Sequence, residues 1–395
     1  MNFGIYYHTP YFQDEKGAIF IAGYFGVFLD ELAAQNTTLF VILHSRKVRT
    51  VNEDYQLKSG NIKVINLGNH PSFYKRVLFP SPYILHIKQE VLRHKIEHIL
   101  VRAPSPLAPH IVNQLATICK VTYLLVGSYI QGISSLQQPW YRKYPVILIN
   151  YYYQFLQNKS IKGKSILVNS GELFDYYKSI ATKVNLVKTT TLVSSDFSRR
   201  LDTCLNPVYQ LLYTGRISFA KGLLEIIQSI ETLIYTHQIN LHFNIVGWED
   251  DATNPVQQAI IKIAKEKKVE HAITFHGRKR IGAELLSMYR KADIYVIPSH
   301  HEGFPRTIWE AMASSLPVIA TSVGSIPYYL KNETNALLIT PKSAQAIESA
   351  ILTIINNGDL RRKLIANGYT LAEDVTLDKQ VSKLIDIIKN EHSGN

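Results

Sequence analysis

The sequence has few cysteines, no long apolar run and no recognisable leader. Its two cysteines in 395 residues, Cys119 and Cys204, are too few for a disulfide framework, so we expect a reducing compartment. The longest apolar run extends from Ala18 to Leu29, about twelve residues, whereas a membrane-spanning helix needs roughly 20. The first residues lack the charged-then-apolar pattern of a signal peptide. Together these absences predict a cytoplasmic chain that does not span a membrane.

Several motifs of other chemistries are also absent. The chain contains no G-x-x-x-x-G-K-[ST], no G-x-G-x-x-G opening its first helix and no G-x-S-x-G. It contains no D-x-D, the usual carboxylate clamp for a diphosphate-bound metal, so we expect neither a metal nor a cofactor. We interpret His300 and His301 as loop residues, because adjacent histidines rarely ligate one metal.

Acidic residues are absent from His98 to Gly171. Residues 1–200 hold 23 Lys and Arg against 11 Asp and Glu, whereas residues 201–395 hold 20 of each, so the first half carries the whole net charge of +12. This asymmetry indicates either ordinary surface solubility or an anionic partner such as a membrane surface. No basic stripe along one helix supports nucleic acid as that partner.

The segment from Ser134 to Lys164 interleaves basic residues with Trp140 and five tyrosines. This mixture suits the interface of an anionic membrane, and it predicts peripheral attachment at the inner face of the cell membrane. The alternative is a buried helix whose tyrosines pack against a sheet. The basic residues concerned are Arg142, Lys143, Lys159, Lys162 and Lys164.

Short apolar runs alternate with helical patterns along the whole chain, such as "TLFVILHS" and "DIYVIPS" against "KGLLEIIQSIETLIYT". Near-continuous apolar strands are typical of parallel sheets covered on both faces. The alternation predicts an α/β protein with two doubly wound, Rossmann-like domains. We place the first at residues 1–200 and the second at 201–375, and expect a helix at 376–395 that crosses back to the first domain.

Charged residues follow the strands of the second half, where ligands bind in such sheets. Arg216 and Lys221 stand between a strand and a helix, and suit an anion held at a helix N-terminus. Glu302 precedes a helix expected to start near Pro305, and Glu310 lies inside that helix among apolar residues. A buried carboxylate there either pairs with a structural donor or accepts hydrogen bonds from a diol.

Glycines also mark the strand ends of this half, at Gly247, Gly277 and Gly324. Each could be a simple turn residue or a point of close backbone approach to phosphate. Several glycines at strand ends favour a cleft over separate turns.

These motifs together resemble the retaining glycosyltransferases of family 4, which have the GT-B fold with two domains facing a central cleft. "YTGRISFAKG" resembles the Gly-Arg … Lys-Gly diphosphate motif, and "HEGFPRTIWEAMASSLPVIATSVGSIP" resembles the E-x7-E signature with its Gly-rich loop. "NIVGWE" and "ITFHGR" resemble two strand ends between them. The first half resembles the family in layout only.

The resemblance implies roles for individual residues. Arg216, Lys221 and Glu302 would be catalytic, with Glu302 on the hydroxyls of the donor sugar and Glu310 on the ribose diol. The full donor-binding set implied is Gly215, Arg216, Lys221, Gly247, Gly277, Arg278, Glu302, Gly303, Phe304, Arg306, Thr307, Glu310 and Gly324.

The sequence departs from the family pattern in the first half. The paired glycines of the first loop are replaced by Gly23 and Gly26, and either could approach the donor phosphate. The segment that usually contains Asn-Gly reads "VSSDF", and the histidine of the first domain has no clear counterpart.

The resemblance implies a retaining hexosyltransferase-type enzyme that moves a sugar from a nucleoside-diphosphate sugar to a hydroxyl acceptor. We expect that acceptor to be a saccharide or lipid-linked oligosaccharide in bacterial-type polysaccharide assembly. Two alternatives remain: a nucleotide-sugar 2-epimerase of the same fold, and a non-catalytic nucleotide-sugar-binding subunit.

Overall fold

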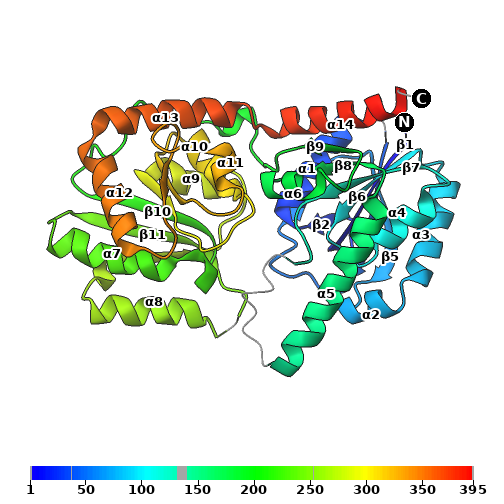
Figure 1. Ribbon diagram of the computed structural model, residues 1–395, viewed down its shortest axis with the longest axis horizontal. Helices are drawn as coiled ribbons and strands as arrows, with labels where there is room; N and C mark the ends of the chain where they lie inside the picture. The colour runs from blue at the N-terminus through cyan, green and yellow to red at the C-terminus, as the bar shows by residue number, and fades with distance from the viewer. Residues whose placement is uncertain (1, 37, 131–139, 252, 394–395) are drawn as a thin grey trace. The chain divides into compact units, whose positions relative to one another are not determined.

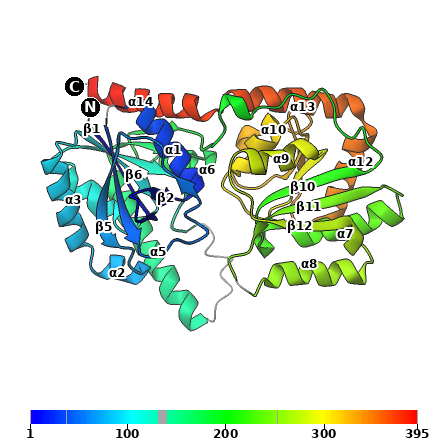
Figure 2. The same cartoon turned by 180° about the vertical axis from the view of Figure 1, so that it is seen from behind.

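The computed structural model describes the whole chain except residues 1, 37, 131–139, 252 and 394–395 (Figure 1). It divides into two compact units. Unit 1 comprises Met1–Thr191 and Leu377–Asn395, and unit 2 comprises Leu192–Thr376. The second unit thus begins at Leu192 rather than at residue 201. Helices cover both faces of the sheet in each unit (Figure 1, Figure 2).

Unit 1 is built on a sheet of nine strands in its described part. The parallel strands run in the order β5-β3-β1-β6-β7-β8-β9, and two short antiparallel strands, β2 and β4, extend from the far end of β1. From β1 the chain continues to β3 and β5 on one side. It then returns to β6 on the other side of β1 and continues to β7, β8 and β9. The strands are β1 (Asn2–Gln13), β2 (Ile19–Ile21), β3 (Thr38–Arg46), β4 (Tyr55–Gln56), β5 (Ile62–Asn69), β6 (His98–Ala103), β7 (Lys120–Leu125), β8 (Ser165–Val168) and β9 (Lys183–Leu186).

The C-terminal helix α14 packs with unit 1, against α1. Lys120 Nζ donates to the carbonyl of Glu391 over 3.0 Å, and the N–H of Lys188 donates to Gln380 Oε1 over 2.9 Å. The helices of this unit are α1 (Gly23–Ala34), α2 (Phe73–Leu78), α3 (Ser81–Arg93), α4 (Ala108–Leu115), α5 (Trp140–Ile161), α6 (Gly171–Tyr177) and α14 (Leu377–Ser393). Among the helices of the described residues, none is long and apolar enough to cross a membrane.

Unit 2 holds a fully parallel sheet in the order β12-β11-β10-β13-β14-β15. Its strands are β10 (Tyr209–Arg216), β11 (Leu241–Trp248), β12 (Ile273–Gly277), β13 (Ile294–Ile297), β14 (Val318–Thr321) and β15 (Leu337–Ile339). Its helices are α7 (Leu223–Tyr235), α8 (Pro255–Glu266), α9 (Ala283–Lys291), α10 (Arg306–Ala313), α11 (Ile326–Tyr329), α12 (Ala344–Asn356) and α13 (Gly358–Glu373).

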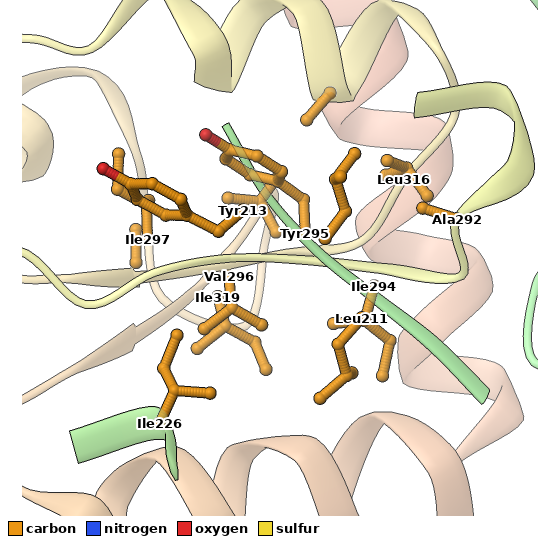
Figure 3. Packing of buried hydrophobic residues seen from close by; sticks show 14 of the residues in the cluster. Leu211, Tyr213, Ile226, Ala292, Ile294, Tyr295, Val296, Ile297, Leu316 and Ile319 are labelled. Carbon is orange, nitrogen blue, oxygen red and sulfur yellow. The ribbon is translucent and has the colours of Figure 1, made fainter. Parts of the chain in front are cut away.

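The core of unit 2 lies on both faces of its central strands. Figure 3 shows Tyr295 and Val296, neighbours on β13, pointing to opposite faces of the sheet, with Ile226 of α7 on the side of Val296. All three are fully buried. The apolar runs that predicted parallel strands are therefore explained by burial on both faces, and every strand expected from such a run is present.

Three strands were not predicted by the sequence. β2, β4 and β9 contain only three, two and four residues. Length alone is not the reason, because β8, β13, β14 and β15 are as short and were predicted. Those four strands are mostly buried, whereas β2, β4 and β9 are half-buried or exposed at most positions.

Candidate functional site

The candidate site lies where the strand order of unit 2 reverses. The chain runs from β10 outward to β12, then returns to β13 beside β10 and continues in the other direction. In open parallel sheets this reversal leaves a crevice beyond the carboxyl ends of the two central strands, and ligands bind there. Arg216 ends β10, and Ser299 to Glu302 follow β13, so two of the predicted motifs meet at this point.

Glycines make the close approach of these strand ends possible. A Cβ at Gly247 would lie 1.8 Å from the carbonyl oxygen of Gly215, its partner across β10 and β11. A Cβ at Gly222 would lie 2.1 Å from the carbonyl oxygen of Pro298, and Gly222 has a positive φ of 67°. The loop after β10 therefore packs directly on the loop after β13.

Lys221 and Glu302 form an ion pair across these two loops. Their side chains are only 19% and 11% exposed. Ser299 Oγ donates to the same carboxylate over 2.8 Å. Because the pair is mostly shielded from water, its attraction is stronger than that of a surface ion pair.

A second contact fastens the same two loops. His300 Nε2 lies 2.7 Å from Glu225 Oε1 in the first turn of α7, and the N–H of His300 donates to the carbonyl of Ala220 over 2.8 Å. His300 therefore holds the loop of Lys221 in place, which agrees with its interpretation as a loop residue.

The loop after β14 also packs against the backbone of Glu302. Gly324 has a φ of 56°, and a Cβ there would lie 1.7 Å from the carbonyl oxygen of Glu302. The N–H of Ser325 donates to the carbonyl of Gly303 over 2.9 Å. Gly324 is thus required for this close contact, which fixes the backbone that carries Glu302.

Glu310 is 5% exposed and lies on α10, which begins after Pro305 as expected. Tyr289 Oη donates to its Oε2 over 2.7 Å, so one carboxylate oxygen has a structural donor. Tyr289 also lies 2.5 Å from Thr214 Oγ1, and Thr214 in turn lies 3.2 Å from Tyr295 Oη. Burial and the charge of Glu310 raise the pKa of Tyr289, which therefore stays protonated.

Arg216 belongs to a more exposed cluster at the outer strand ends. Its Nη1 lies 3.4 Å from Asp250 Oδ2, and Trp248 Nε1 donates to the other oxygen of Asp250 over 3.0 Å. The guanidinium of Arg278 stands 4.4 Å from the centre of the Trp248 ring. Arg216 and Arg278 are therefore linked through two residues, Asp250 and Trp248. Gly277 has a φ of 65° and open space around it.

The first turn of α10 places the remaining candidates. Phe304 stacks on Trp309 with ring centres 4.4 Å apart and meets Tyr329 edge-on, so most of its ring packs within unit 2. Arg306 and Thr307 are the first two residues of α10, and both are partly buried. A Cβ at Gly303 would have no other atom within 4 Å, so space is open beside this residue.

The first-loop candidates Gly23 and Gly26 belong to unit 1, where both lie on α1. The N–H of Gly23 donates to Asp54 Oδ1 over 2.8 Å. A Cβ at Gly26 would lie 2.4 Å from the ring of Tyr55. Packing of α1 on β4 accounts for Gly26.

Four residues at the site were missed by sequence reasoning: Tyr289, Ser299, Asp250 and Glu225. Ser299 and Asp250 directly follow strands, so their positions gave a usable signal. Tyr289 and Glu225 lie on helices, and only three-dimensional packing brings them to the site. Among the described residues, no group of three His, Cys, Asp or Glu side chains is arranged to hold a metal ion.

Residues 206–371 match the family described as Glycosyl transferases group 1. This segment contains the whole candidate site of unit 2. Among curated relatives, the chain is 29% identical over 185 residues to a D-inositol 3-phosphate glycosyltransferase of Corynebacterium glutamicum, covering 46% of this chain and 44% of that protein. It is 28% identical over 171 residues to the capsular polysaccharide biosynthesis glycosyltransferase CapM of Staphylococcus aureus, covering 43% of each. The aligned segments thus span less than half the length of these relatives.

Two solved structures share the fold along the whole chain. The sucrose-phosphate synthase of Thermosynechococcus elongatus superposes with a TM-score of 0.74 at 17% identity, covering 100% of this chain and 99% of that one. The Anabaena protein HepE in complex with UDP superposes with a TM-score of 0.71 at 16% identity, covering 99% and 100%. The fold is therefore GT-B, with two Rossmann-like domains, and the comparisons together support a glycosyltransferase.

Proposed function

We propose that this protein is a retaining glycosyltransferase of family 4, which moves a hexosyl group from a nucleoside-diphosphate sugar to a hydroxyl acceptor. The observation that carries the proposal is the shielded pair of Lys221 and Glu302 at the strand reversal of unit 2. The close contacts at Gly222 and Gly324 pack the neighbouring loops around this pair, which supports a preorganised site. The E-x7-E spacing of Glu302 and Glu310 supports the same assignment.

The proposed chemistry is departure of the nucleoside diphosphate while the sugar gains positive charge. Lys221, Arg216 and the N-terminal turn of α10 neutralise the charge that develops on the diphosphate. These cations take the role that a metal ion has in other transferases, so turnover requires no divalent ion. Glu302 binds hydroxyls of the donor sugar, and Glu310 binds the ribose diol with the oxygen opposite Tyr289.

The acceptor proposed is a saccharide or lipid-linked oligosaccharide in polysaccharide assembly. One relative named for capsular polysaccharide biosynthesis supports this class. The test is incubation of the full chain with a panel of nucleotide sugars, with and without lipid extract and oligosaccharides. A new glycoside with retained configuration supports the proposal. An epimerised nucleotide sugar formed without acceptor would identify a 2-epimerase, and binding without any turnover would identify a non-catalytic subunit.

We further propose that α5 attaches the protein reversibly to an anionic membrane. Six large apolar residues on this helix are exposed, and they recur every three or four positions, which places them on one face. Of the five tyrosines, only Tyr153 is buried, at 1% exposure. The exposed residues are Tyr141, Tyr144, Leu148, Tyr151, Tyr152 and Phe155.

The charges beside this face select its partner. Lys159 lies on α5 four positions after Phe155, Lys162 follows the end of the helix, and both are exposed. The surrounding sequence from His98 to Gly171 contains no acidic residue that would repel an anionic lipid surface. Residues 134–139 of the proposed segment lie outside the described residues.

The membrane proposal is tested by co-sedimentation with vesicles. We expect binding to vesicles containing anionic lipid, with weakening as salt rises. Replacing Lys159 and Lys162 with Gln should weaken sedimentation without changing nucleotide affinity. Replacing the exposed Lys262 and Lys265 of α8 provides the matched control. Equal sedimentation with neutral vesicles, or none with either kind, would refute the proposal.

A further inference from the structure

The strand order of unit 1 reverses between β1 and β6, as it does in unit 2 between β10 and β13. His8 lies in β1 beyond the point where β1 and β6 separate, and Arg102 is the penultimate residue of β6. Nothing in the proposed function uses these residues. By the general rule for open parallel sheets, this reversal is a second place where a ligand binds.

The side chain of Arg76 is buried in this region, and no counter-ion for it is found in the described part of the chain. Arg76 lies on α2 and is 5% exposed, and neither its Nε nor its Nη1 has a hydrogen-bond partner among the described residues. The ionisable groups that act on its charge most strongly are the hydroxyls of Tyr6, Tyr83 and Tyr129, not carboxylates. Burial lowers the pKa of Arg76, although an arginine remains charged at any physiological pH.

Three histidines share this environment. Burial, together with the charges of Arg76 and Arg102, holds the pKa of His8 at about 3. Burial and the charge of Arg76 hold the pKa of His44 at about 3 as well. His70 donates from Nε2 to the carbonyl of His8 over 3.1 Å, and burial and Arg76 lower its pKa. The three rings therefore stay neutral at neutral pH, and they add no negative charge to balance the arginines.

Arg102 provides a second buried cation in the same region. It is 8% exposed, and its Nε has no hydrogen-bond partner within the described ranges of the chain. Its guanidinium stands 4.5 Å from the centre of the Tyr7 ring and 5.2 Å from that of Phe25. These rings stabilise the cation partly, but they cannot neutralise it.

Glu53, an acidic side chain that acts on His70, already has other partners. Glu53 is 2% exposed, accepts from the N–H and the hydroxyl of Thr50, and pairs with Arg46 over 3.6 Å. It influences His70 but is not among the groups acting on Arg76. Among the described residues, no carboxylate pairs with Arg76 or Arg102.

An unpaired buried cation lowers the stability of a fold, and folded proteins rarely retain one without a use. Arginine presents a planar fork of N–H donors that matches the oxygens of a phosphate. Tyr6 and Tyr129 act on the charge of Arg76, and both contact Ser105: Tyr6 Oη lies 2.8 Å from Ser105 Oγ, and Tyr129 Oη donates to the carbonyl of Ser105 over 2.5 Å. We propose that Arg76 and Arg102 form an oxyanion site in unit 1, which binds a phosphate group. If the protein is the transferase proposed above, this phosphate belongs to its acceptor.

The site is tested by calorimetry of the full chain with inorganic phosphate, sulfate and acetate. Arg76→Gln removes the fork, and we expect it to weaken phosphate binding at least about tenfold, as loss of a charge-assisted bond does. Lys75→Gln is the matched control: it removes the same charge from the adjacent, exposed position of α2. We expect Lys75→Gln to leave phosphate affinity within about twofold of the parent. Equal losses in both variants would reduce the site to a general surface potential and overturn the proposal.

The stability of the ligand-free protein gives an independent readout. Because an unpaired cation is removed, Arg76→Gln should unfold at the same or a higher temperature than the parent without phosphate. Phosphate should raise the melting temperature of the parent and of Lys75→Gln, but not that of Arg76→Gln. A large destabilisation by Arg76→Gln, with no effect of phosphate on the parent, would show that Arg76 is structural.

A comparison of ligands identifies the source of the phosphate and separates this inference from the proposed function. A hexose monophosphate should compete with inorganic phosphate, whereas the neutral hexose should not. Nucleoside-diphosphate affinity should fall in Lys221→Gln but not in Arg76→Gln. If Arg76→Gln weakens the nucleotide as much as Lys221→Gln does, the anion belongs to the donor and the acceptor assignment is wrong. Phosphate binding without any sugar transfer would leave the site standing and refute only the proposed function.

Discussion

The two units repeat one architecture and differ in how they balance charge at the strand reversal. In unit 2, Lys221 pairs with Glu302 and Arg216 with Asp250, and His300 contacts Glu225. In unit 1, Arg76 and Arg102 have no carboxylate partner among the described residues. Unit 2 therefore keeps its polar side chains in place before any ligand arrives, whereas unit 1 holds unmatched positive charge.

This difference has a physical consequence for each unit. A paired, shielded site is preorganised, so a ligand must compete with an existing carboxylate but finds its donors already oriented. An unpaired site is destabilised until an anion arrives, so ligand binding there raises stability. The excess of Lys and Arg over Asp and Glu in residues 1–200 is consistent with this difference, because most of these residues belong to unit 1.

The largest effect is expected at the paired site, from Lys221→Gln. Loss of one preorganised charge beside the leaving group should lower kcat by about 100-fold or more, with a smaller change in KM. Steady-state kinetics with the active nucleotide sugar provides the measurement. Lys262→Gln, which removes an exposed lysine of α8, is the control and should retain full activity. A Lys221 variant with nearly normal kcat would remove this lysine from the chemistry.

A pair of glycine variants separates site packing from backbone strain in unit 2. Gly324 and Gly277 both have positive φ, but only a Cβ at Gly324 meets another atom, the carbonyl oxygen of Glu302 at 1.7 Å. We expect Gly324→Ala to cost roughly 2–3 kcal/mol and to lower activity sharply, because Glu302 must move. Gly277→Ala should cost about 1 kcal/mol and lower activity less than Gly324→Ala does, because it leaves Glu302 in place. The stability of both variants is measured by urea unfolding, and their activity by kcat. Equal losses of activity in the two variants would contradict the role of Gly324 in positioning Glu302.

The sequence predicted unit 2 better than unit 1, for reasons visible in single residues. Arg216 and Glu302 follow strands whose apolar runs are unmistakable, so topology alone brings them to one edge of the sheet. Arg76 lies on α2, a helix of six residues, and its burial depends on tertiary packing that no local pattern displays. His8, His44 and Arg102 lie on three different strands. The sequence alone does not show that these side chains come together, or whether a carboxylate lies beside them.

For Glu310, the sequence predicted its position in a buried helix but left its role undecided. The sequence allowed a structural donor or a ligand diol, and the structure supplies a structural donor in Tyr289. If the other oxygen binds ribose, Glu310→Gln should weaken nucleoside-diphosphate binding by roughly 1.5–3 kcal/mol in calorimetry. Tyr289→Phe is the companion variant, since it removes only the structural bond. If both variants lose the same stability and keep the parent's nucleotide affinity, Glu310 has a structural role and does not bind the nucleotide.

The smallest effect is expected from pH and arises in unit 1. His8 and His44 have folded-state pKa values of about 3, below the value of about 6.5 of an unfolded histidine. Between these values the unfolded chain binds more protons than the folded one, so stability is complete above about pH 6.5 and falls as the pH decreases. The loss should be roughly 1 kcal/mol per histidine for each pH unit below about 6. Urea unfolding at pH 7.5, 6.5 and 5.5 measures this loss of stability.

Arg76→Gln should reduce the dependence of stability on pH, because the charge of Arg76 is one cause of both low pKa values. Lys75→Gln should leave this dependence unchanged. A slope that is the same in all three proteins would mean that the arginine charge is not felt by the histidines, and the contrast between the two units would lose its electrostatic basis.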